Sequence, residues 1–82
     1  MDKASQSLIG EMSIMDRSGH KELKWNMDNL EEIAVAKQTF DTLTRSGYSA
    51  FASKTRAEAK HTIREFDPTM EEMVMVPRTV GG

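Results

Sequence analysis

The sequence predicts an α+β fold in which one long helix packs across a mixed sheet of four to five strands. Residues 29–46 place apolar side chains every three or four positions, which is the spacing of one helix face. Short apolar or alternating stretches separated by Gly, Asp and Pro lie on both sides of that segment, as is typical of strands and turns. The 82 residues fit one small domain, expected at 8–77 between a flexible lead-in at 1–7 and a tail at 78–82.

The first two strands are predicted at residues 12–15 and 20–25. Residues 16–19 separate them and carry Asp at the first and Gly at the last position of a type I turn. The second strand alternates, so that Leu23 and Trp25 are expected to face the core. The two strands therefore form a hairpin.

The helix has signals at both of its ends. Asp28 or Asn29 can accept hydrogen bonds from the first free amides, and two glutamates follow in the first turn. Gly47 provides the left-handed residue that ends the helix. The apolar residues expected to share one stripe are Leu30, Ile33, Ala36, Phe40 and Leu43.

The C-terminal half is predicted to complete the sheet. Residues 48–52 are expected to return as a strand beneath the helix. Residues 57–66 are compatible with a helical turn or a strand, and a strand over 61–66 is favoured. The apolar run 73–76 is expected to be a strand buried on both faces and ended by Pro77. The resulting element order resembles that of the β-grasp fold.

The composition disfavours catalysis and cofactor binding. The chain has no cysteine, so it has neither disulfides nor thiolate ligands, which fits a reducing, cytoplasmic location. His20 and His61 lack partners at a metal-binding spacing. Asp16, Ser18 and His20 lie too close along one turn and strand to form a catalytic triad. Because these patterns for catalysis and metal binding are missing, we expect no enzyme and no cofactor. No apolar run is long enough to span a membrane, so we also expect no membrane partner.

Charge is distributed unevenly along the second half of the chain. A basic run could touch a phosphate backbone, and its members are Lys54, Arg56, Lys60 and Arg64. Nucleic-acid binding is nevertheless disfavoured, because the run has no interleaved aromatic residues and the net charge is −2. An acidic cluster follows and is expected to be a solvated loop; its members are Glu65, Asp67, Glu71 and Glu72.

The last nine residues suggest a specific function. Residues 74–82 read Val-Met-Val-Pro-Arg-Thr-Val-Gly-Gly, which resembles the last strand and tail of ubiquitin-like modifiers and their sulfur-carrier relatives. The resemblance implies that an E1-like or ThiF-like activating enzyme uses ATP to adenylate the Gly82 carboxylate. Gly81 and Gly82 would pass a narrow channel because they have no side chain. The residues expected to contact that partner are Pro77, Arg78 and Val80.

A second resemblance leads to the alternative hypothesis. Several short motifs are similar to those of a group of small proteins from bacteria and their phages, a similarity that implies no activity. The motifs are Asp16-Arg17-Ser18-Gly19, Trp25, Phe40-Asp41, Gly47-Tyr48, Ala50-Phe51, Phe66-Asp67-Pro68 and the final Gly-Gly. The alternative is therefore a small non-enzymatic structural or adaptor protein whose partners are its neighbours in a bacterial or phage assembly.

Overall fold

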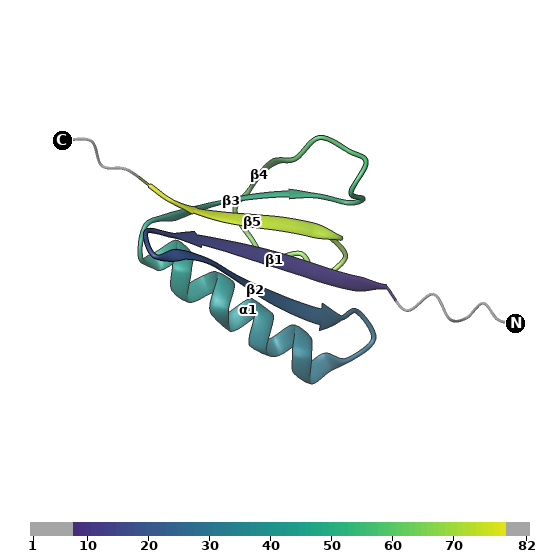
Figure 1. Cartoon of the computed structure of the whole chain (residues 1–82). Coiled ribbons are helices and arrows are strands. Elements are labelled where there is room, and N and C mark those ends of the chain that lie inside the picture. The colour runs from purple at the N-terminus through teal and green to yellow at the C-terminus, as the bar shows by residue number, and fades with distance from the viewer. Residues whose placement is uncertain (1–7, 79–82) are drawn as a thin grey trace, which may run out of the picture.

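The computed structural model describes residues 8–78, and Figure 1 shows how their elements are arranged. One helix and five strands are present in this part of the chain. Their bounds are β1 Ile9–Asp16, β2 Gly19–Asn26, α1 Leu30–Arg45, β3 Tyr48–Ser53, β4 His61–Ile63 and β5 Glu72–Pro77. The predicted α+β class, with one helix and a mixed sheet, is confirmed.

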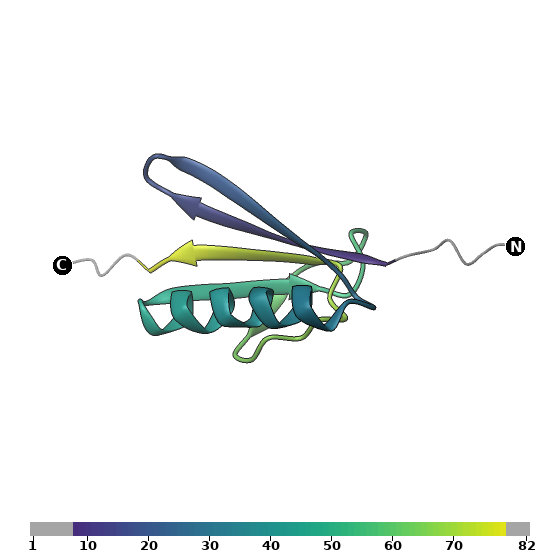
Figure 2. The same cartoon turned by 90° about the horizontal axis from the view of Figure 1, so that it is seen from below.

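The five strands form one sheet in the order β2-β1-β5-β3-β4. The central strands β1 and β5 are parallel, and every other pair of neighbours is antiparallel. Met73 of β5 lies opposite Met12 on one side and Ala52 on the other. The helix lies against one face of this sheet, as Figure 2 shows from below. No other helix of residues 8–78 covers the opposite face.

The β1–β2 hairpin closes through a local hydrogen-bonded turn. The Asp16 carboxylate accepts hydrogen bonds from the Ser18 amide at 3.0 Å and the Ser18 hydroxyl at 3.3 Å. Gly19 has a φ of +133°, which a residue with a side chain rarely adopts. A turn at residues 16–19 and the predicted hairpin are confirmed, and both strands extend beyond the predicted 12–15 and 20–25.

Both ends of α1 follow the predicted signals. The Asn29 side chain accepts hydrogen bonds from the amides of Glu31 and Glu32, which identifies Asn29 rather than Asp28 as the N-cap. Gly47 has a φ of +99° and follows the last turn. The helix is therefore fixed by polar groups that are adjacent in sequence.

The prediction that Leu30 shares the buried stripe is wrong. Ala36 and Phe40 are buried, and Ile33 and Leu43 pack against the core, but the Leu30 side chain is 81% exposed. At about 100° per residue, Leu30 points roughly 100° away from the mean direction of the other four. It therefore faces solvent at the start of the helix.

The core fills the space between α1 and the covered face of the sheet. Trp25 and Phe40 are its largest buried side chains, and three methionines of the strands, Met12, Met73 and Met75, complete it. Phe66 packs between the two aromatic rings, with centroid distances of 5.2 Å to Trp25 and 5.8 Å to Phe40. The Trp25 indole donates a hydrogen bond to the Pro68 carbonyl at 3.0 Å. The core therefore joins the hairpin, the helix and the segment before β5.

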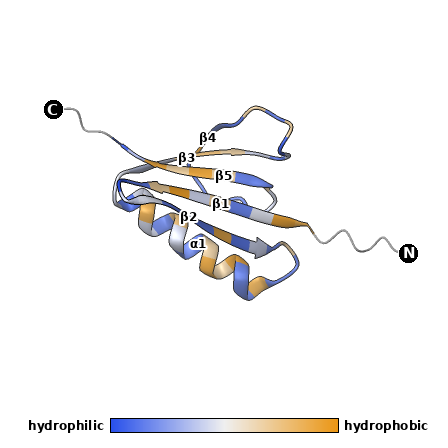
Figure 3. Ribbon diagram, in the orientation of Figure 1, coloured by the Kyte–Doolittle hydropathy of each residue, from blue (hydrophilic) through white to orange (hydrophobic). Residues whose placement is uncertain are grey.

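Two predictions for the C-terminal strands need correction. β4 ends at Ile63 instead of residue 66, because the chain leaves the sheet there and brings Phe66 into the core. β5 is not buried on both faces, since Val74 and Val76 are only half-buried on the uncovered side. Figure 3 shows that β5 is nonetheless hydrophobic along its middle. The apolar run reflects the central position of β5 rather than a second covering layer.

Candidate functional site

The end of β5 is held at the centre of the sheet up to the last described residue. Pro77 lies opposite Tyr48, the first residue of β3. The Arg78 amide then donates a hydrogen bond of 3.2 Å to the carbonyl of Gly47. The predicted contact residues Pro77 and Arg78 are both exposed. The chain therefore leaves the sheet at the turn between α1 and β3, where its backbone is held by β3 and Gly47, whereas the pairing with β1 ends at Met75.

The exit of β5 lies at the same end of the molecule as the β1–β2 turn and the end of α1 (Figure 1). Because β1 and β5 are parallel, the β1–β2 turn with Arg17 lies at this end. The last residue of α1, Arg45, also lies there, because the chain passes directly from it into β3, which runs antiparallel to β5. Arg17, Arg45 and Arg78 are all exposed. Three exposed arginines therefore lie at the end of the molecule where the chain leaves the sheet.

The remaining predicted tail residues, Val80, Gly81 and Gly82, lie outside the described residues. The sequence predicted Gly47 only as the residue that ends the helix and gave no indication that it contacts the end of β5. Its carbonyl anchors Arg78, which lies 31 residues further along the chain. Local sequence carries a signal for the helix cap but none for this backbone contact.

The predicted basic run does not form a free cationic surface. Arg56 extends from the β3–β4 loop to Glu11 of β1 at 3.1 Å and to Glu72 of β5 at 3.8 Å. Lys60 contacts Glu72 at 2.7 Å. Glu11 and Glu72 lie directly opposite each other on the parallel strands, so the two cations neutralise a pair of like charges.

The other two members of the run lie apart from these ion pairs. Lys54 donates a hydrogen bond to the Thr69 hydroxyl at 3.4 Å. Arg64 follows β4 and takes part in none of the salt bridges between residues 8 and 78. The four basic residues are thus divided among three different surroundings.

The acidic cluster was expected to be a solvated loop, but several of its carboxylates accept hydrogen bonds. Glu71 accepts a hydrogen bond from the Arg56 amide at 3.0 Å, and Asp67 accepts hydrogen bonds from the Thr69 hydroxyl and amide. The hydrogen bond from Lys60 holds the pKa of Glu72 below its ordinary value of 4.5, and the charges of Lys60 and Arg56 act in the same direction. The Thr69 hydroxyl lowers the pKa of Asp67 in the same way. These carboxylates fix the β3–β4 loop and the turn before β5.

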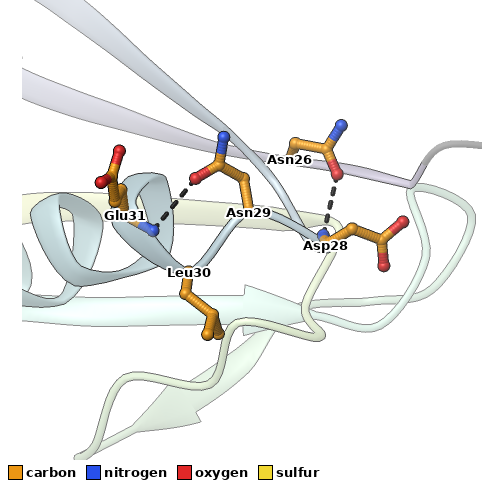
Figure 4. A pocket seen from close by; sticks show the side chains of 5 residues that line it. All are labelled: Asn26, Asp28, Asn29, Leu30 and Glu31. Carbon is orange, nitrogen blue, oxygen red and sulfur yellow. Dashed lines mark hydrogen bonds between the residues drawn. The ribbon is translucent and has the colours of Figure 1, made fainter.

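A hollow also lies at the start of α1 and is shown in Figure 4. Asn29 and Asn26 line it, and their side chains accept hydrogen bonds from the amides of Glu31 and Asp28. Glu32 accepts a further hydrogen bond from the Asn26 amide at 2.7 Å. The amides of Asp28, Glu31 and Glu32 here already have side-chain partners, an arrangement that serves to cap the helix.

Searches against known protein families, curated proteins and solved structures find no match to the chain. Within residues 8–78, no group of three or more His, Asp or Glu side chains could hold a metal ion. The helix in this range, α1, is not long and apolar enough to cross a membrane. Asp16 and Ser18 bond to each other in the turn, while the His20 imidazole lies 3.8 Å from Glu22.

Proposed function

We propose that this protein is a ubiquitin-like modifier or carrier whose Gly82 carboxylate is activated by an ATP-dependent E1-like enzyme. The observation that carries the proposal is the position of β5, which lies at the centre of the sheet and delivers Arg78 to a fixed point on Gly47. A tail that leaves a fixed strand is presented to a partner in one direction, which reduces the ordering that binding requires.

The strand order supports the same proposal. The order β2-β1-β5-β3-β4, with β1 parallel to β5 and one helix against the sheet, is the arrangement expected of a β-grasp protein. In that fold the last strand is internal, and the residues after it project from the end of the sheet. Gly81 and Gly82 lie three and four residues beyond Arg78 in the sequence, a spacing that is compatible with activation of such a tail.

The chemistry requires only the terminal carboxylate from this chain. A Gly82 carboxylate oxygen attacks the α-phosphorus of ATP, which forms an acyl-adenylate and releases pyrophosphate. A thiol, amine or hydroxyl then attacks the acyl carbon, gives up its proton and displaces AMP. The carboxylate must be free, either as the natural end of the chain or after cleavage following Gly82. The activating enzyme supplies the catalytic groups, so this chain is a substrate rather than an enzyme.

Intact-mass analysis tests the proposal. The chain is incubated with ATP, Mg²⁺ and an E1-like or ThiF-like activating enzyme from the same organism, and we expect an adenylate followed by a thioester that dithiothreitol cleaves. Removal of Gly82 should abolish both species, whereas the matched variant Thr79→Ala should form them. Absence of any adduct on the native chain, or adduct formation that survives removal of Gly82, would overturn the proposal.

The alternative, an adaptor in a bacterial or phage assembly, is favoured by the uncovered face of the sheet. Phe51 and Val74 lie opposite each other there, Val76 lies two residues beyond Val74, and all three side chains are half-buried. An adaptor function predicts that Phe51→Glu disrupts recovery of the assembly and that removal of Gly82 does not. The modifier proposal predicts that removal of Gly82 is the damaging change.

A further inference from the structure

The outer edge of β2 is open, and its hydrogen-bonding groups can be assigned residue by residue. Within the described sheet β2 is a terminal strand and pairs with β1. The Met27 amide donates to the Leu8 carbonyl at 3.0 Å, whereas the Asn26 amide donates to the Glu32 carboxylate at 2.7 Å. Alternate residues of an antiparallel strand bond to the same neighbour. Odd-numbered residues of β2 therefore face β1, and the backbone groups of even-numbered residues face outward.

The open part of this edge is short and has defined ends. Glu32 occupies the outward amide of Asn26, and the Arg17-Ser18 turn ends the strand at the other side. Between these limits the outward groups belong to His20, Glu22 and Lys24, and none of them forms a backbone hydrogen bond outside the β1–β2 ladder in residues 8–78. Such an edge can accept one further strand.

The side chains of this edge restrict the strand that can pair with it. Two copies of β2 in antiparallel pairing are related by a two-fold axis at one residue. An axis at Glu22 places two glutamates opposite each other, and an axis at Lys21 does the same with two lysines. An axis at Leu23 instead places Glu22 of each copy opposite Lys24 of the other. Like charges opposite each other destabilise a sheet, whereas unlike charges stabilise it. The Leu23 register is the one that β2 favours.

We propose that two copies of this chain associate through β2, with Leu23 on the two-fold axis and the two five-stranded sheets joined into one. The hydrogen bonds between Glu22 and Lys24 form twice, and so do their ion pairs. Leu23 meets its counterpart on the helix side of the sheet. It lines a groove there with Val35 of α1, an apolar side chain that is 54% exposed in one copy.

Charge complementarity favours a second copy over an unrelated strand. Alternating charges on an edge discourage pairing with most strands, and here they match the same sequence running in the opposite direction. The association does not depend on the proposed function, because the tail leaves from the end of β5, two strands away from the edge. If Gly82 were not activated, the dimer would be unaffected, and if the dimer did not form, activation of Gly82 would be unaffected.

A cysteine scan tests the register, because the natural chain contains no cysteine. Residues opposite each other in a non-hydrogen-bonded antiparallel pair have Cα atoms about 4.5 Å apart, within the range of about 4.4–6.8 Å that disulfides span. We expect Leu23→Cys to form a disulfide-linked dimer under mild oxidation. The matched controls Lys21→Cys and Glu22→Cys, which report the other two registers, should remain mostly monomeric. Equal cross-linking of all three, or none for a folded Leu23→Cys, would overturn the proposal.

A charge exchange tests the same contact without touching Leu23. Sedimentation equilibrium of the native chain should show a monomer–dimer equilibrium. Glu22→Lys or Lys24→Glu alone should weaken the dimer about tenfold, since each change affects two pairs per dimer. The double exchange should restore the native affinity, and circular dichroism checks the folding of every variant. A native chain that stays monomeric up to about 1 mM, leaving the edge for a different protein, or a double exchange that restores nothing, would contradict the proposal.

Discussion

Gly10 of β1 lies directly opposite Trp25 of β2, and the indole ring covers the position where a side chain at residue 10 would begin. A Cβ atom at residue 10 would lie 2.7 Å from the indole Nε1 and closer still to Cε2 and Cζ2. Trp25 is buried and is also held by Phe66 and Pro68. The largest side chain of the core therefore has its place because residue 10 is glycine.

Gly10→Ala is expected to reduce the free energy of unfolding by about 2–3 kcal/mol, because the added methyl group displaces a fixed ring. Urea denaturation followed by circular dichroism at 222 nm measures the change in every variant, including those that lack the single tryptophan. Ser13→Ala, on the same strand but facing the uncovered side, is the matched control and should cost far less. In Gly10→Ala/Trp25→Phe the loss should be smaller than the sum of the two single losses, and strict additivity would contradict the contact.

Asn29→Ala is expected to destabilise the protein by about 1 kcal/mol, because two amides at the start of α1 lose their acceptor. Asn29→Asp retains an acceptor and should cost little. Gln38→Ala, on the exposed side of the same helix, controls for changes in helix propensity. Thermal denaturation followed at 222 nm measures all three, and equal stability of the Ala and Asp variants would rule out the capping role.

Gly47→Ala is expected to cost about 1 kcal/mol, because its φ of +99° strains any residue that has a Cβ. Beyond the two neighbouring residues, nothing lies within 4 Å of the position of that Cβ, so the cost comes from the backbone and not from crowding. The same variant should speed hydrogen exchange of the Arg78 amide, which donates to the Gly47 carbonyl. Ser46→Ala serves as the control, and unchanged exchange at Arg78 would show that the two residues are not coupled.

The ion pairs of Glu72 predict a pH dependence. Because the pKa of Glu72 is lowered in the folded protein, its contribution to stability is present above the ordinary value of 4.5 and is lost as the pH falls through the folded pKa. Glu72→Gln should cost about 0.5 kcal/mol at pH 7, a small value because the pair is partly exposed. The difference from the native chain should shrink toward zero in acid.

Urea denaturation at several pH values between neutrality and acid measures this dependence. The control is Glu58→Gln, because Glu58 is exposed in the β3–β4 loop and its carboxylate forms no ion pair within residues 8–78. That variant should follow the native chain at every pH. A Glu72→Gln deficit that is independent of pH would show that packing, not charge, is responsible.

The elements that could be predicted from the sequence are those fixed by neighbours along the chain. Asn29 and Gly47 act within a few residues of the helix they bound, and the Asp16 turn closes on Ser18. The contacts that could not be predicted join distant segments. Arg56 and Glu11 lie 45 residues apart, and nothing near either residue indicates the other. The sequence therefore indicated a possible basic patch, although two members of the run form ion pairs with glutamates of the sheet.

Local sequence patterns were sufficient to specify the α+β class, the limits of the helix and the alternation of the first hairpin, because capping and side-chain periodicity act over a few residues. Which faces those elements bury depends on the packing of distant segments, since burial requires another segment to lie opposite. Leu30 is exposed, Val74 and Val76 have no layer above them, and Gly10 receives the indole of Trp25. The central place of β5 was decided in the same way, because strand order depends on pairing across the whole chain.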